Sequence, residues 1–138
     1  MKILVDTNLF IDILLEREPF FEASALIYKL CENGLVEGVI APITVNNIYY
    51  ICRKAKRINE IKAFLADLSH VFKITTMDSE SITKANRLPI GDYEDALQYA
   101  MALQNGCSYL VTRNTKDFKK LSRIVVLTPE AFLDIASI

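Results

Sequence analysis

The sequence predicts an α/β fold, a single three-layer α/β/α domain over residues 1–138 with a mostly parallel central sheet of about five strands. Short apolar runs typical of buried strands alternate with longer segments whose apolar residues recur at helical spacing. No repeat and no low-complexity linker marks a second domain. Strands that are separated by helices favour a parallel sheet covered on both faces.

The expected elements of the first half follow from apolar runs and from helix start and stop signals. In order, we expect a strand at 2–5, a short helix at 8–15, a longer helix at 20–33, a strand at 36–41, a helix from Pro42 and another at roughly 58–69. The pair Asn33-Gly34 is a usual stop at a helix C-terminus. Proline is favoured in the first turn of a helix, so Pro42 indicates a helix start.

The second half continues the alternation. In order, we expect a strand at 72–75, a helix at 79–88, a helix that follows IGDYEDALQYA and stops at Asn105-Gly106, strands at 107–112 and 123–128, and a last helix from Pro129 to the end. In such sheets, ligands bind outside the carboxyl ends of the strands. The residues directly after each strand are therefore the candidates for chemistry.

Composition excludes several classes of protein. Sixteen basic and seventeen acidic residues give a net charge of −1, which argues against a general nucleic-acid coat but allows a local basic patch. The apolar stretches are short and broken by charges, so we expect no membrane span and no secretion signal. The three cysteines are far apart without a C-x-x-C pair, which indicates reduced core residues in a cytoplasmic protein.

Acidic and amide side chains follow two of the expected strands. Asp6 comes directly after the first strand, and Asn114 and Asp117 follow the strand at 107–112. Asp6 has two interpretations, an N-cap of the next helix or a site residue. Asn8 and Thr112 lie beside these positions and have amide or hydroxyl oxygens that can orient a ligand or a water molecule.

Three carboxylates crowd the start of a largely apolar helix at Asp92, Glu94 and Asp95. Asp92 and Glu94 are explained as ordinary helix-start acids, because acids in the first turn cap the helix and favour its dipole. Asp95 shares its turn with apolar residues, where a carboxylate is costly unless a cation or hydrogen-bond donors meet it. Carboxylates that converge on one point favour Mg²⁺ or Mn²⁺, and such a site suits phosphodiester hydrolysis.

Three stretches of the chain together resemble a PIN domain. They are ILVDTNLFIDIL near the N-terminus, APITVNNIYYICRK in the middle, and DYEDALQYAMALQNGCSYLVTRNTKDF from 92 to 118. Their order and spacing agree with the family over essentially the whole chain. The resemblance implies a Mg²⁺- or Mn²⁺-dependent ribonuclease that acts on an RNA substrate and often forms a homodimer. Many small members resemble VapC-type toxins, which implies an antitoxin protein as a partner.

The resemblance also implies site residues. Asp6, Asp95 and Asp117 match the acids that bind the metal and carry catalysis, and Asp92 is a supporting acid one turn before Asp95. Asn114 stands where many members have Asp. The basic residues beside Asp117, namely Arg113, Lys116 and Lys119, are the candidates for contacts with RNA.

One position departs from the family pattern. The family usually has Glu early in the central helix, where this chain has Asn47. An amide can bind a water molecule or weakly ligate a cation, but it brings no negative charge. Two hypotheses therefore stay open: an active endoribonuclease, or a catalytically weak PIN-fold module that binds RNA or a protein partner.

Overall fold

A five-stranded sheet with the order β3-β2-β1-β4-β5 forms the centre of the computed structural model, which describes residues 1–136. The strands are β1 (Lys2–Val5), β2 (Glu37–Ile40), β3 (Lys73–Ile74), β4 (Tyr109–Val111) and β5 (Val125–Leu127). All four pairings between neighbouring strands are parallel. The predicted α/β fold with a parallel sheet is confirmed, although the strand expected at 72–75 contributes only two residues.

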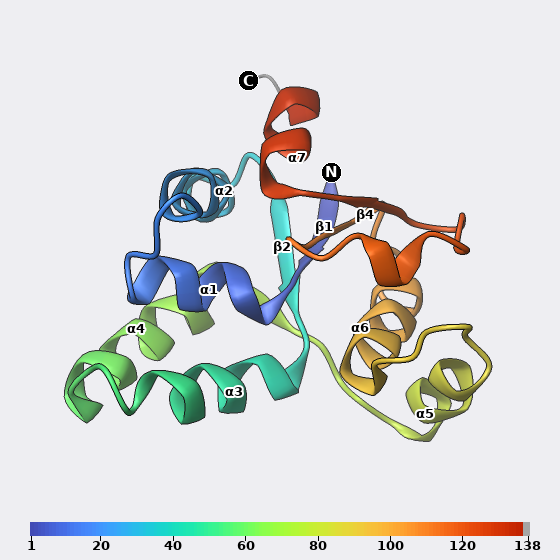
Figure 1. The fold of residues 1–138 in the computed structure, drawn as a ribbon, viewed down its shortest axis with the longest axis horizontal. Coiled ribbons are helices and arrows are strands. Elements are labelled where there is room, and N and C mark those ends of the chain that lie inside the picture. Colours follow the sequence, from blue (N-terminus) through green and yellow to red (C-terminus); the bar gives the residue numbers. More distant parts are fainter. Residues whose placement is uncertain (137–138) are drawn as a thin grey trace.

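Helices occupy the segments between the strands, as expected (Figure 1). They are α1 (Thr7–Leu14), α2 (Phe21–Glu32), α3 (Pro42–Cys52), α4 (Ile58–Val71), α5 (Ser79–Asn86), α6 (Tyr93–Gln104) and α7 (Pro129–Ala136), with a short 3-10 helix η1 (Lys116–Phe118). The last helix was expected to reach the end of the chain, and residues 137 and 138 lie outside the described part.

The predicted stop signals act as expected. Gly34 and Gly106 follow α2 and α6 with φ angles of +75° and +67°, a left-handed conformation that residues with a Cβ rarely adopt. Pro42 and Pro129 are the first residues of their helices, where a missing N–H costs nothing. Local chemistry therefore accounts for the C-terminal ends of α2 and α6 and for the N-terminal ends of α3 and α7.

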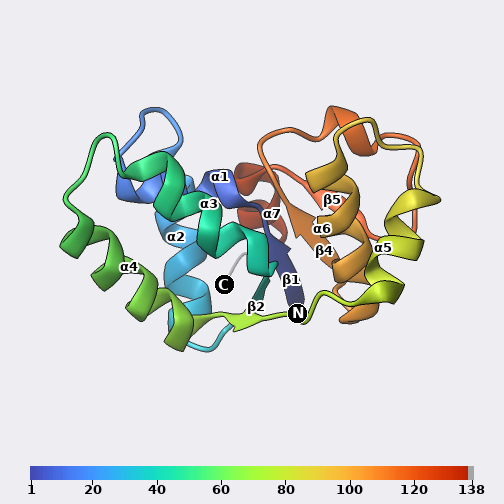
Figure 2. The same cartoon turned by 90° about the horizontal axis from the view of Figure 1, so that it is seen from below.

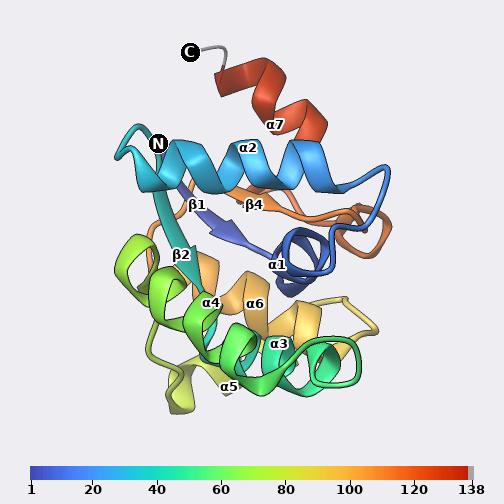
Figure 3. The ribbon, with the colours of Figure 1, turned by 90° about the vertical axis from the view of Figure 1, so that its left-hand side faces the viewer.

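The two faces of the sheet carry separate cores. Ile3 and Val5 pack into a core shared with α1, α2, α3, α4 and α7, whereas Leu4 between them packs into a second core with Tyr99 and Met101 of α6. Figure 2 shows α6 and α5 on one side of the strands and α2, α3 and α4 on the other. Figure 3 shows α7 beside α2. The architecture is the expected three-layer sandwich.

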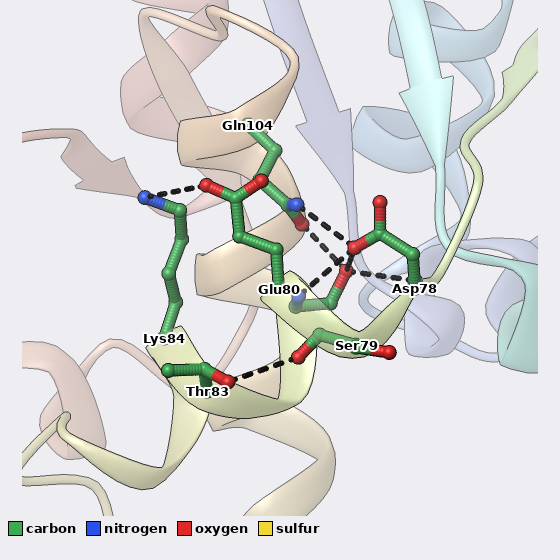
Figure 4. A network of polar contacts seen from close by, with 7 residues as sticks. Asp78, Ser79, Glu80, Thr83, Lys84 and Gln104 are labelled. Atoms are coloured by element: carbon green, nitrogen blue, oxygen red, sulfur yellow. Dashed lines mark hydrogen bonds and ion pairs between the residues drawn. The ribbon is translucent and has the colours of Figure 1, made fainter.

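A polar network holds α5 against the far end of α6 (Figure 4). Asp78 caps α5 by accepting a hydrogen bond from the backbone N–H of Ser81 at 3.1 Å. Gln104, the last residue of α6, accepts a hydrogen bond from the Ser81 hydroxyl at 2.6 Å and donates one to Asp78 at 3.2 Å. This network fixes the C-terminal end of α6, while its N-terminal end lies at the carboxyl ends of the strands.

Two predictions from composition have structural counterparts. Cys31, Cys52 and Cys107 are all buried and free, as expected for core thiols. Of the helices described, not one combines the length and the apolar character that crossing a membrane requires.

Candidate active site at the strand ends

Asp6 follows β1 and is held by side chains from two other elements. Its backbone N–H donates to the carbonyl of Val111 at 3.0 Å, which extends the pairing of β1 with β4. Its side chain makes no cap hydrogen bond to α1. Instead Oδ2 accepts from the hydroxyl of Thr112 at 2.8 Å, and Oδ1 accepts from Nε2 of Gln98 at 2.9 Å. The carboxylate is thus 5% exposed and oriented by neutral donors.

Gln98 was absent from the predicted site and reaches it from α6. It is 1% exposed, and its Oε1 has no hydrogen-bond partner among the described residues. A buried amide oxygen without a partner is costly, so it marks a place where a polar ligand or a water molecule would be stabilised. The sequence signal was a glutamine inside an otherwise apolar helical segment, between Leu97 and Tyr99.

Asp92 and Asp95 divide two roles at the start of α6. Asp92 is the N-cap, and its Oδ1 accepts a hydrogen bond from the backbone N–H of Asp95 at 3.0 Å, as expected for a helix-start acid. The half-buried Asp95 has its pKa raised to about 7, first by burial, then by the charges of Asp6 and Asp92, and then by a hydrogen bond and the charge of Asp117. Asp95 is therefore close to all three acids.

Asp117 lies on η1, after β4, and is exposed. Its Oδ2 accepts a hydrogen bond from Nδ2 of Asn114 at 2.8 Å, and the backbone N–H of Asn114 donates to the hydroxyl of Thr112 at 3.1 Å. Because Thr112 also donates to Asp6, one chain of hydrogen bonds joins the two acids. Asp6 and Asp117 are thus linked through Thr112 and Asn114, and the charges of both acids raise the pKa of Asp95.

Glu94 is more than the helix-start acid that the sequence indicated. Its Oε1 accepts a hydrogen bond of 2.6 Å from Nδ2 of Asn47 on α3. Burial raises the pKa of Glu94, the charges of Asp6 and Asp92 add to this, and the hydrogen bond from Asn47 opposes it. Asn47 therefore pairs with Glu94, a carboxylate whose pKa responds to the charges of Asp6 and Asp92.

Arg113, a predicted RNA contact, binds another part of the protein. Its guanidinium donates to both oxygens of Asp12 on α1, at 2.7 and 3.1 Å, and lies 4.0 Å from the ring centroid of Phe20. The Arg113 side chain is 27% exposed, and the Asp12 side chain is fully buried. Arg113 thus ties the segment after β4 to α1.

The remaining predicted residues lie at the edge of the site. Lys116 and Lys119 flank Asp117 on the chain and are exposed, which leaves their ammonium groups open to solvent. Asn8 is also exposed, and no side-chain hydrogen bond within residues 1–136 involves it. The expectation that Asn8 orients a ligand therefore has no contact to support it.

The side chains suit a hard divalent cation by their chemistry. Within residues 1–136, no three His, Cys, Asp or Glu side chains already stand together as a metal-binding group. The side-chain atoms that could ligate an ion here are nevertheless carboxylate oxygens, together with the Oε1 atom of Gln98, which has no hydrogen-bond partner among the described residues. No ion pair between described side chains involves Asp6, Asp95 or Asp117, so their mutual repulsion is uncompensated. Mg²⁺ or Mn²⁺ fits this set of donors.

Comparison with known proteins gives a family match and one curated relative. The model of the PIN domain family matches residues 2–116. Ribonuclease VapC1 from Aquifex aeolicus (strain VF5) is 28% identical to this chain over 141 residues, which cover 96% of this chain and 94% of the relative.

Solved structures have the same fold. A toxin-antitoxin complex from Klebsiella pneumoniae contains a chain with a TM-score of 0.68 and 22% identity, covering 91% of this chain and 96% of that one. The DNA-bound VapBC from Salmonella typhimurium gives a TM-score of 0.70 with 19% identity, covering 94% and 98%. At these identities the likeness establishes the fold alone.

Proposed function

This chain belongs to the PIN domain family, and from that premise we propose that it is a metal-dependent endoribonuclease that hydrolyses RNA phosphodiester bonds. The observation that carries the proposal is the group of acids at the ends of β1 and β4. Burial and then the charges of neighbouring acids, Asp6 and Asp117 among them, raise the pKa of Asp95, and no cationic side chain in residues 1–136 pairs with any of these three acids. The relative named ribonuclease VapC1 supports the same reaction.

Each acid has its own part in this proposal. Asp6, Asp95 and Asp117 would hold Mg²⁺ or Mn²⁺, with Asp92 behind Asp95. When bound, the cation supplies a Lewis acid for a phosphate oxygen and favours ionisation of a water molecule. Thr112 keeps Asp6 oriented through its 2.8 Å hydrogen bond.

The RNA contacts follow from charge and exposure. Lys116 and Lys119 are exposed next to Asp117, where they would meet the phosphates that flank the reacting bond. Arg113 would contribute chiefly by holding the Thr112–Asn114 segment through Asp12, with its remaining exposed surface available to RNA. The proposal includes an antitoxin protein as a partner, by analogy with the toxin-antitoxin complex from Klebsiella pneumoniae. It also includes a homodimer and a cytoplasmic location.

The test of this function asks about the metal and the reaction separately. Crystals soaked in Mn²⁺ should give an anomalous-scattering peak that touches Asp6 and Asp95. Purified protein should cut RNA with Mg²⁺ or Mn²⁺, and neither EDTA-treated protein nor the Asp95→Asn variant should do so. A site that stays free of Mn²⁺ at high concentration, in crystals and with RNA present, would contradict the proposal.

A second candidate function rests on Asn47. The amide supplies no charge at that position of α3, which favours a catalytically weak module that binds RNA or a protein partner. If the protein is such a module, it should bind RNA as tightly in EDTA as in Mn²⁺ and should cleave RNA under neither condition. The endoribonuclease expects Mn²⁺-dependent cleavage, so one binding and cleavage assay on the same RNA separates the two.

A further inference from the structure

Helix α6 presents Glu94 and Gln98 on the same face. Residues four apart lie one above the other on a helix. Gln98 touches Asp6, because its Nε2 donates to Oδ1 of Asp6 at 2.9 Å. Glu94 stands one turn closer to the N-terminus of α6, so it lies over the same strand end.

The Glu94 carboxylate is fixed by a neutral donor from another helix. Nδ2 of Asn47 donates to Oε1 at 2.6 Å, which joins α6 to α3 across the site. The other carboxylate oxygen, Oε2, receives no hydrogen bond from the side chains of residues 1–136, and Glu94 forms no ion pair with them. Glu94 is half-buried. One oxygen is therefore held in place while the other stays available.

Ordinary explanations do not account for this arrangement. The cap of α6 is already provided by Asp92, which accepts from the backbone N–H of Asp95. An acid that served only the helix dipole would extend into solvent, where its charge costs least. Glu94 instead turns toward α3 and loses part of its hydration. A cation beside the Glu94 carboxylate would offset the cost of this partial burial.

We propose that Glu94, held by Asn47, is the fourth carboxylate of the metal site and supplies its negative charge on the α3 side through Oε2. The proposal rests on the metal-dependent function proposed above. Asn47 then acts as a positioning residue: its amide contributes no charge of its own and holds the carboxylate that does. On this view the amide at 47 leaves the site with its full charge, because α6 provides what α3 lacks.

Mn²⁺ binding to the full chain tests this directly, with the electron paramagnetic resonance signal of free Mn²⁺ as the readout. We expect Glu94→Gln to weaken binding by about 10-fold to 100-fold. The matched control is Glu130→Gln, which makes the same change at the second residue of α7, an exposed position. It removes an equivalent first-turn charge from another helix, so we expect wild-type affinity. Thermal unfolding without metal checks that both variants fold.

A double variant separates charge from structure. Combining Asn47→Glu with Glu94→Gln exchanges the amide and the carboxylate between α3 and α6 and retains a donor and an acceptor. If the site needs one carboxylate at this junction, Mn²⁺ affinity should return toward the wild-type value. A purely structural role for the Asn47–Glu94 pair predicts no such rescue. Should Glu94→Gln alone fail to fold, the double variant decides the question.

The outcomes distinguish this proposal from the proposed function. Wild-type protein that binds Mn²⁺, with Glu94→Gln binding equally well, would overturn the role of Glu94 and leave the metal-dependent function standing. Wild-type protein that binds no Mn²⁺ would overturn both. Weakened binding in Glu94→Gln, with normal binding in Glu130→Gln and rescue in the double variant, would establish the fourth carboxylate.

Discussion

Two buried carboxylates near the start of the chain, Asp12 and Asp6, are treated in opposite ways by the fold. The Asp12 side chain is fully buried and receives two hydrogen bonds from Arg113, with Arg17 at 3.9 Å. Asp6 is 5% exposed, yet its partners are the hydroxyl of Thr112 and the amide of Gln98. The Arg113 guanidinium pairs with Asp12, whereas no cationic side chain in residues 1–136 pairs with Asp6.

We infer from this difference that Asp12 has a structural role and that Asp6 belongs to the proposed metal site. A buried charge is tolerated when an opposite charge meets it with good geometry. Acids that repel one another destabilise the fold unless a ligand compensates them. We therefore expect the ion pair of Asp12 to stabilise the fold. We expect the repulsion among the acids at the strand ends to be relieved by a bound cation.

The strongest test of this comparison is to remove the structural carboxylate. Asp12→Ala leaves the Arg113 guanidinium without its partner, so we expect the free energy of unfolding in urea to fall by about 3–5 kcal/mol. The control is Glu32→Ala, which breaks the exposed pair with Lys29 at 3.1 Å and should cost no more than about 1 kcal/mol. Equal losses in the two variants would contradict the structural role of Asp12.

Removing a functional acid should have the opposite effect on stability. Asp95→Asn relieves repulsion from Asp6, Asp92 and Asp117, so we expect a higher melting temperature at pH 8 in EDTA. Cleavage of RNA should fall by a factor on the order of 100 or more, because the proposed site loses a charge and a ligand of the cation. If the variant is less stable than wild type in the absence of metal, Asp95 has a structural role like that of Asp12.

The pH dependence sharpens the comparison further. The pKa of Asp95 is raised from 3.8 to about 7 in the folded protein, so between these values the folded state binds a proton that the unfolded state lacks. This contribution makes the metal-free protein less stable as pH rises from 4 to 7. In EDTA, the melting temperature of the wild-type protein should fall as pH rises across this range. The melting temperature of Asp95→Asn should depend less steeply on pH.

Metal binding should show the complementary pH dependence. A cation binds the ionised form of Asp95, so protons compete with it and Mn²⁺ affinity should fall as pH drops below about 7. Affinity that stays constant from pH 8 to pH 5.5 would mean that Asp95 does not ligate the ion.

The smallest expected effects concern the exposed lysines beside the acids. Each of Lys116→Ala and Lys119→Ala should lower the salt dependence of RNA binding by about 0.7 in the slope of log affinity against log salt, if each lysine contacts one phosphate of a single strand. Lys62→Ala, which removes an exposed lysine from α4, is the matched control and should leave the slope unchanged. Unchanged slopes for all three variants would exclude these lysines from the RNA interface.

Several features of the molecule could be predicted from the sequence because they depend on neighbouring residues. Asn33-Gly34 and Asn105-Gly106 end helices as expected, and Pro42 and Pro129 begin them. The apolar runs became strands of a parallel sheet, which placed Asp6 and Thr112 at one edge. Asp92 was predicted to cap its helix and does so. Apolar residues recur every second residue in a half-buried strand and every three to four residues in a helix, so a short window of sequence is enough to predict these elements.

Other features depended on segments that are distant in the chain. The hydrogen bond from Asn47 to Glu94 spans 47 residues, that from Gln98 to Asp6 spans 92, and that from Arg113 to Asp12 spans 101. From local patterns we predicted Glu94 as a helix-start acid and Arg113 as an RNA contact. A local pattern contains no information about which side chain of another element will face these residues.

The sequence by itself therefore determined the order of elements, the fold class and the acids at the strand ends. Only the tertiary structure decided which acid has a cationic partner and which lies among other acids. The physical reason is that helix and strand signals act over a few residues, whereas the stability of a buried charge depends on the partner that the fold brings to it. Asp12 forms an ion pair with Arg113, whereas the charges that shift the pKa of Asp95 and Glu94 are those of other acids, Asp6 among them.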